Sequence, residues 1–287
     1  MLAVREEAVL DHASIRTLAA ALVLALPAAV GGAQAAEVYP DLSGGGWARL
    51  GPANWDPDKP RGLGQQAPLT AEYRAIFEAS LSDQSTGGQG NDPGYRCRPH
   101  GMPRIMNANH PLFFAITPET TYVFRDIANQ SRRIYTDGRT WPASLQHSAN
   151  GYSIGQWRDE SGSGRYDTLV VETRGLKNPH SYDSSGIPFH RDDAATVKER
   201  IYLDKASADV LHDEITTFDH ALTRPWTVTR NYRRQRDAKW VEYICAEDNH
   251  HVVIGKEDYL LSADNQLMPT HKDQPPPDLR NFGQAAK

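Results

Sequence analysis

The best candidates for acid–base chemistry lie in a long polar connection between two predicted strands. This connection runs from Glu172 to Val197 and carries His190, with Asp192 two residues further on. A histidine ring titrates near neutral pH, and either Asp192 or the following Glu199 can orient it as a general base. Connections of this length are often lids or binding loops, although a solvated loop histidine is the simpler alternative.

Alternation along the predicted strands places further charged side chains among apolar ones. Residues two apart on a strand share a face, so Glu199 shares a face with Ile201. Arg230 likewise shares a face with Trp226 and Tyr232. A charge on an apolar face requires a partner or a function. If these faces point into a barrel, its interior suits a small, partly aromatic molecule.

Two more charged positions follow the same pattern. His212 is expected on an inward face together with Glu214 and Thr216. Glu242 is expected beside Trp240 on the last predicted strand. The alternative to a pocket is a set of buried ion pairs, or an outward face that carries a few apolar residues.

These residues predict proton transfer on a small hydrophobic or aromatic compound, by a lyase or isomerase that needs no cofactor. The candidate catalytic residues are His190, Glu199 and His212. The candidate substrate-binding residues are Arg224, Trp226, Arg230, Tyr232 and Trp157, of which an arginine would hold an anionic or phenolic group. Two alternatives stay open: a periplasmic binding or carrier protein with the same pocket, and an envelope-associated structural module without one.

Other chemistries have weaker signatures. No pair among the eleven histidines shows the spacing of a known zinc or iron site, so no metal is expected. Cys97, His100, Met102 and Met106 resemble soft copper ligands, but a disulfide at Cys97 would remove that option. Ser153 sits in a Gly-Tyr-Ser-Ile-Gly sequence like a hydrolase nucleophile elbow, yet the residues after it continue as a strand rather than turning into a helix.

Residues 1–35 predict a signal peptide. Arg16 precedes an apolar run from Leu18 to Val30, and Ala33 to Ala35 form a small-residue cleavage site. The leader before Arg16 is unusually acidic, which a misplaced start codon would explain. A membrane anchor is the alternative, but the run is shorter than the roughly 20 residues that span a bilayer. We therefore expect a periplasmic or secreted protein.

Export affects how the two cysteines are interpreted. An oxidising compartment favours pairing, and Cys97 with Cys245 is the one intramolecular pair available. The bridge would close nearly the whole folded domain, which the chain-entropy model values at roughly 4 to 5 kcal/mol. The rival interpretation makes Cys97 a metal ligand or a nucleophile.

The composition is that of an ordinary folded protein, with 39% hydrophobic and 23% charged residues. The net charge is -5 and no run of like charges occurs, which argues against nucleic acid or an anionic membrane surface as partner. The expected partner is a small hydrophobic or aromatic molecule, and no stable membrane insertion is expected.

Residues 36–94 predict an N-terminal arm followed by one helix. The arm is rich in Gly, Pro, Asp and Trp and has no periodicity. Thr70 can cap the helix, in which Tyr73, Phe77 and Leu81 recur at helical spacing.

From Pro111 onward the sequence changes to short runs of Val, Ile, Thr, Tyr and Phe between turn residues. We expect strands near Leu112–Ile116, Thr121–Ile127, Ser131–Tyr135, Tyr152–Trp157, Thr168–Thr173, Val197–Leu203, Val210–Phe218, Trp226–Arg233 and Lys239–Ala246. So many strands close or sandwich to remove their edges. The sequence thus predicts a mainly β domain over 95–263, as an antiparallel calycin- or lipocalin-like barrel or, alternatively, a β-sandwich. An irregular tail over 264–287 follows.

A set of motifs between about residues 95 and 250 carries a resemblance. They are Gly101-Met102-Pro103-Arg104, Arg132-Arg133-Ile134-Tyr135-Thr136-Asp137-Gly138-Arg139, Gly151-Tyr152-Ser153-Ile154-Gly155-Gln156-Trp157, Asp167-Thr168-Leu169-Val170-Val171-Glu172-Thr173, Glu199-Arg200, Thr223-Arg224-Pro225-Trp226-Thr227-Val228 and Glu242-Tyr243-Ile244-Cys245. The chain resembles a large, mostly uncharacterised group of exported bacterial β-rich proteins. The resemblance implies a shared fold and no particular activity. Arg158 to Tyr166 depart from the pattern with a Gly- and Ser-rich extension.

Overall fold

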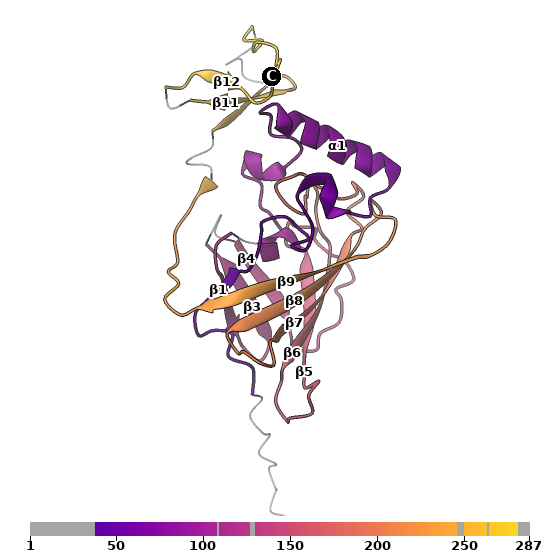
Figure 1. Cartoon of the computed structure of the whole chain (residues 1–287), viewed down its shortest axis with the longest axis vertical. Helices are drawn as coiled ribbons and strands as arrows, with labels where there is room; N and C mark the ends of the chain where they lie inside the picture. The colour runs from indigo at the N-terminus through magenta and orange to yellow at the C-terminus, as the bar shows by residue number, and fades with distance from the viewer. Residues whose placement is uncertain (1–37, 108, 127–129, 246–249, 263, 281–287) are drawn as a thin grey trace, which may run out of the picture. The chain divides into compact units, whose positions relative to one another are not determined.

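Nine strands, β1 to β9, close into a barrel in the computed structural model (Figure 1). The model describes residues 38–280 except 108, 127–129, 246–249 and 263, so the predicted signal peptide lies outside the described residues. Within these ranges, none of the helices has the length and apolar character needed to cross a membrane.

The barrel strands follow one another around the ring in chain order. They are β1 (Gly46–Arg49), β2 (Leu112–Ile116), β3 (Thr120–Arg125), β4 (Gln130–Tyr135), β5 (Tyr152–Arg158), β6 (Thr168–Arg174), β7 (Thr196–Leu203), β8 (Val210–Phe218) and β9 (Trp226–Gln235). The ring closes where β9 pairs with β1, with Arg234 opposite Trp47. The prediction of a mainly β barrel is confirmed, and the sandwich is not formed.

One pair of neighbouring strands departs from the expected antiparallel arrangement. β4 and β5 run parallel and pair over only two positions, Ile134 with Ser153 and Tyr135 with Ile154. Every other neighbouring pair in the barrel is antiparallel. The prediction of a purely antiparallel barrel was therefore wrong at this position.

The ends of the predicted domain differ from the structure in two ways. β1 belongs to the barrel although it lies within the arm expected over 36–94, so the arm and the barrel are not separate. Of the strand expected over Lys239–Ala246, the described residues 239–245 contain a single bridge residue, Tyr243, and no continuous strand. Instead, β10 (His251–Ile254), β11 (Glu257–Leu261) and β12 (Leu267–Pro269) form a three-stranded sheet that begins before the predicted tail and extends into it.

The predicted helix is α1 (Ala71–Ser85), and Thr70 lies at its N-cap position without making a side-chain cap. The helix buries Tyr73 and Phe77, as the periodicity indicated. Three short 3-10 helices complete the described helical structure: η1 (Gly62–Gln65), η2 (Pro93–Arg96) and η3 (Arg104–Asn107).

The barrel interior is filled by large side chains and by the chain's own N-terminal arm. The largest fully buried side chains include Trp47, Trp55, Arg125, Arg132, Arg230, Tyr182 and Tyr232. Arg230 Nη1 donates to the carbonyl oxygens of Asn54 at 2.9 Å and Trp55 at 3.0 Å. Tyr232 Oη donates to the Met106 carbonyl at 2.5 Å. Residues expected to bind a ligand therefore bind the arm and η3 instead.

A buried ion pair crosses the barrel interior between β4 and β7. Arg132 donates to both carboxylate oxygens of Glu199, through Nη1 at 2.8 Å and through Nη2. Its remaining donors reach the hydroxyls of Ser153 at 3.3 Å and Thr173 at 3.0 Å. The two charged side chains are 1% and 0% exposed. Both Glu199 oxygens accept from Arg132, and Arg132 has two further acceptors, so the cost of burying the two charges is offset by hydrogen bonds.

Asp213 on β8 is a further acid in this interior. It is fully buried, and neither of its carboxylate oxygens is hydrogen-bonded among the described residues. Burial, with the nearby Glu199 carboxylate, raises the pKa of Asp213 well above its ordinary value, although Arg132 acts in the opposite direction. The folded protein therefore holds Asp213 as the neutral acid over a range of pH in which the unfolded chain ionises it.

This raised pKa predicts a pH dependence of stability. The pKa of Asp213 is higher in the folded protein than in the unfolded chain, where it is 3.8. The stabilisation that comes from the neutral acid is therefore fully present below pH 3.8 and is lost as the pH rises through the folded pKa. We expect Asp213→Asn, which cannot ionise, to show a smaller fall in unfolding free energy between pH 5 and pH 8 than the unaltered protein. Urea denaturation at both pH values measures this difference. Equal falls in both proteins would contradict the raised pKa.

Candidate functional site

The structure separates the three predicted catalytic residues. Glu199 is inside the barrel in its ion pair with Arg132. His190 is half-buried in the connection between β6 and β7, where Asp192, as expected, lies 3.0 Å from its Nδ1. His212 contacts other residues, Asn231 and Asp204. Each of the three has different partners, so they do not form one catalytic group.

His212 is on the opposite face of β8 from the one predicted. The buried positions of β8 are Leu211, Asp213, Ile215 and Thr217, whereas His212 and Glu214 are partly exposed. Both faces of this strand carry apolar and polar residues, so the sequence pattern does not show which face is buried. A shift of one residue exchanges the buried and the exposed face.

The predicted substrate-binding residues are also dispersed. Trp226 packs with Trp55 and Tyr182 in the core, while Arg230 and Tyr232 bind backbone carbonyls. Trp157 donates to Thr121 Oγ1 at 3.0 Å and lines a separate groove. Arg224 is exposed beside another pocket, and Glu242 is exposed outside any strand.

A pocket of about 300 Å³ lies beside the disulfide. Cys97 and Cys245 form the predicted bridge, which joins positions 148 residues apart. The pocket is lined by Gly94, Cys97, Arg98, His100, His110, Gln130, Tyr243 and Cys245. Segments far apart in the chain thus meet here, and the disulfide holds two of them together.

His110 and Asp126 form a hydrogen-bonded pair at this pocket. They flank the β2–β3 hairpin, in which Leu112 pairs with Arg125, so both lie just beyond the same end of the ladder. His110 Nδ1 is 3.2 Å from Asp126 Oδ2, and the Asp126 side chain is 1% exposed while that of His110 is 38% exposed. A buried carboxylate that accepts from Nδ1–H leaves Nε2 as the basic nitrogen.

Gln130 supplies an unsatisfied amide at the same pocket. It is the first residue of β4, pairs with Arg125 across the ladder and is 7% exposed. Neither its Oε1 nor its Nε2 has a hydrogen-bonding partner among the described residues. A buried amide without partners is unfavourable, and a polar group of a ligand in the pocket would satisfy it.

His100 forms a neutral part of the pocket wall. Arg125 Nη1 donates to His100 Nδ1 at 2.8 Å, which leaves the ring hydrogen on Nε2. Burial, together with the cations Arg104 and Arg125, lowers the pKa of His100 to about 2. His100 is therefore a hydrogen-bond donor and not a base at physiological pH.

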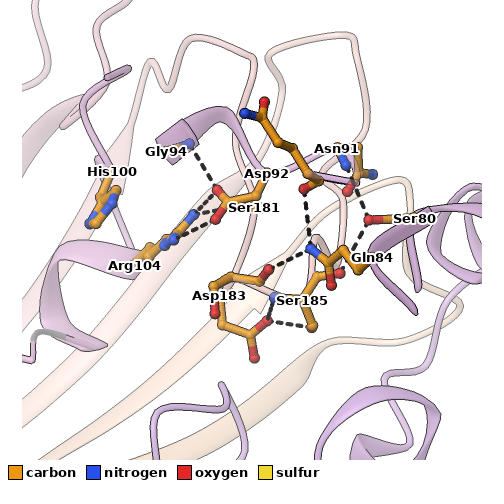
Figure 2. A network of polar contacts seen from close by, with 12 residues as sticks. Ser80, Gln84, Asn91, Asp92, Gly94, His100, Arg104, Ser181, Asp183 and Ser185 are labelled. Carbon is orange, nitrogen blue, oxygen red and sulfur yellow. Dashed lines mark hydrogen bonds and ion pairs between the residues drawn. The ribbon is translucent and has the colours of Figure 1, made fainter. Parts of the chain in front are cut away.

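A buried polar network fixes the loops behind His100 (Figure 2). Arg104 pairs with Asp92 and donates to Ser181 Oγ at 2.7 Å. Asp92 Oδ1 also accepts from the Gly94 backbone N–H at 2.8 Å. The network thereby holds η2, which leads directly to Cys97, against the start of η3.

A second group of polar contacts joins neighbouring loop residues to α1 (Figure 2). Ser80 donates to the Ser185 carbonyl at 3.3 Å and accepts from the Asn91 N–H at 3.1 Å. Gln84 donates to the Ser184 carbonyl at 2.9 Å. The helix therefore holds the start of the segment that leads through η2 to Cys97, together with the connection between β6 and β7.

Sequence reasoning missed His110, Asp126 and Gln130 as site residues. His110 precedes a proline and Asp126 follows a strand, and neither position carries a recognisable motif. The predicted disulfide was the one sequence feature that indicated the place of the pocket, because Cys97 and the nearby His100 both line it.

Neither a protein-family model nor a curated protein matches the chain. The chemistry of the site is consequently inferred from its geometry.

Proposed function

We propose that the protein is an exported lyase or isomerase that uses acid–base chemistry, without a cofactor, on a small hydrophobic or aromatic compound in the disulfide pocket. One observation carries this proposal: the same pocket is lined or adjoined by the His110–Asp126 pair and by the Gln130 amide, which has no partner among the described residues. A base and a binding group thus lie together where a small molecule fits.

His110 is the proposed catalytic base. Its Nε2 takes a proton from the substrate, and the resulting imidazolium is stabilised by the Asp126 carboxylate at Nδ1. The same Nε2–H then returns the proton at another atom of the substrate, which completes an isomerisation or assists departure of a leaving group in a lyase reaction. No other reactant is required for this proton balance.

Binding is assigned to the other pocket residues. The Gln130 amide pairs with a polar substituent, while the exposed Arg98 at the pocket attracts an anionic or phenolic group. Tyr243 and the disulfide supply apolar contact. In this proposal the barrel serves as a calycin-like scaffold with the ligand at one end, because its interior is filled by its own side chains.

A binding and turnover screen tests the proposal. We would incubate the oxidised protein with a panel of small phenols and aromatic acids, detect binding by calorimetry and follow products by mass spectrometry. His110→Gln should lower kcat at least about 100-fold, because general-base contributions are of that order, while binding is retained. Gln130→Leu should instead weaken binding.

His212→Gln is the matched control, since His212 also pairs with an aspartate, Asp204, but away from the pocket. Its kcat should equal that of the unaltered protein. Turnover that persists in His110→Gln would show that the base is elsewhere. Binding without any turnover in the unaltered protein would identify a carrier.

A further inference from the structure

His190, Asp192 and His220 meet away from the disulfide pocket. Asp192 lies between the two imidazoles: Oδ1 is 3.0 Å from His190 Nδ1, and Oδ2 is 2.5 Å from His220 Nδ1. One potential ligand atom from each residue lies within 4.8 Å of the other two. The other His–carboxylate contacts of the described residues contain one histidine each.

The surrounding chain fixes the position of His190. Its backbone N–H donates to Asp219 Oδ2 at 3.0 Å, and its carbonyl accepts from Asn178 Nδ2 at 2.6 Å. The ring packs against Tyr73, with centroids 5.1 Å apart. Asp192 is held by a bond from the Ala194 N–H to Oδ1 at 3.1 Å. Two of the three side chains are therefore already oriented, as ligands of a metal site usually are.

We propose that this cluster binds one divalent transition-metal ion of the zinc class, independently of the proposed acid–base function. Two imidazole nitrogens and one carboxylate oxygen form the ligand set of many zinc sites that keep a position open for water. Tetrahedral ligands at about 2.0 to 2.2 Å from one zinc ion lie about 3.3 to 3.6 Å from each other. The ligand atoms of the cluster lie within 4.8 Å of one another, so small side-chain rotations would place them around one ion. On binding, any proton held at either Nδ1 is released to solvent.

The ion would join two segments that are distant in sequence. His190 and Asp192 belong to the connection between β6 and β7, whereas His220 follows β8, 28 residues after Asp192. This separation explains why no short-spaced metal motif was found in the sequence. His220 is the adaptable ligand, because its side chain is 72% exposed and can rotate toward the ion.

Calorimetric titration with ZnCl2 of the oxidised protein, prepared without an affinity tag, tests the proposal. We expect saturable one-to-one binding to the unaltered protein. His220→Ala and Asp192→Asn should each weaken it at least about tenfold, because each removes one of three ligands. His212→Ala, which breaks a pair with one histidine only, should leave the affinity unchanged.

Exposure of His220 and Asp192 makes both variants expected to fold, and thermal denaturation without metal verifies this. Cobalt(II) gives a second readout, since its visible absorption depends on coordination by nitrogen ligands and should be lost in His220→Ala. The proposal is overturned if the unaltered protein shows no saturable binding, or if either variant binds zinc as tightly as the unaltered protein.

Discussion

Replacing Arg132 by methionine is expected to lower the free energy of unfolding by about 3 to 5 kcal/mol, because it leaves a buried charge without its partner. Glu199 would keep its position at 0% side-chain exposure with the guanidinium gone. The hydroxyls of Ser153 and Thr173 would lose a donor at the same time.

Glu199→Gln should lower the free energy of unfolding by less than Arg132→Met does. In Glu199→Gln the Arg132 cation remains, and the nearby Asp213 can ionise to balance it. Asp213 is held neutral by burial and by Glu199, and Arg132 already favours its ionisation. We therefore expect the pKa of Asp213 to fall in Glu199→Gln, and the double variant Glu199→Gln with Asp213→Asn to lose the stability that this ionisation had preserved.

Urea denaturation at pH 7 measures both effects. Arg133→Met is the matched control, because Arg133 is the next residue on β4 but its side chain is exposed. Its stability should change by no more than about 0.5 kcal/mol. A similar loss in Arg132→Met and Arg133→Met would show that the buried pair contributes little. A larger loss in Glu199→Gln than in Arg132→Met would contradict the compensating role of Asp213.

The disulfide is expected to give the second large effect. Cys97 and Cys245 are 148 residues apart, and closing such a loop in the unfolded chain corresponds to about 5 kcal/mol in the chain-entropy model. We expect the double variant Cys97→Ser with Cys245→Ser to lose about 2 to 5 kcal/mol, since measured losses usually fall below the model. It should also bind pocket ligands more weakly, because both cysteines line the pocket.

A reductant distinguishes loss of the bridge from other effects of the substitutions. Dithiothreitol should lower the stability of the unaltered protein to that of the double variant and should leave the double variant unchanged. If the unaltered protein is equally stable with and without reductant, under conditions where mass spectrometry shows both thiols free, the bridge does not stabilise the fold.

The fold was largely predictable where the strands are long and the pattern has period two. β2 and β8 have the expected bounds, and most other barrel strands differ by one or two residues. β1 was missed because its four residues, the first of them a glycine, are too few to show alternation of apolar and polar residues. Its partner β9 is also far away in the sequence, so the pairing has no local signal. The strand over Lys239–Ala246 was predicted from β propensity, but its described residues 239–245 form no continuous strand and are held by the disulfide at Cys245 and by the bond from Val241 N to Asp126.

The candidate site was less predictable because its residues meet only through tertiary structure. Glu199 and Arg230 were correctly assigned to inward faces, but their partners, Arg132 and the carbonyls of the arm, could not be identified from local pattern. His110 and Asp126 become neighbours through the β2–β3 register, in which Leu112 faces Arg125. The charge of Glu199 on an apolar strand face was interpreted as a sign of either a ligand pocket or a buried ion pair, and the structure has the ion pair with Arg132.

The parallel pairing of β4 with β5 follows from parity. Strand direction alternates around a ring in which all neighbours are antiparallel, so such a ring must contain an even number of strands. This ring contains nine, and one neighbouring pair has to run in the same direction. The two strands are staggered, because the last two residues of β4, Ile134 and Tyr135, pair with Ser153 and Ile154 near the start of β5. The connection over residues 136–151 therefore has to return along the strand direction by only about two residues before β5 begins. A single extra strand inserted between β4 and β5 would restore alternation throughout.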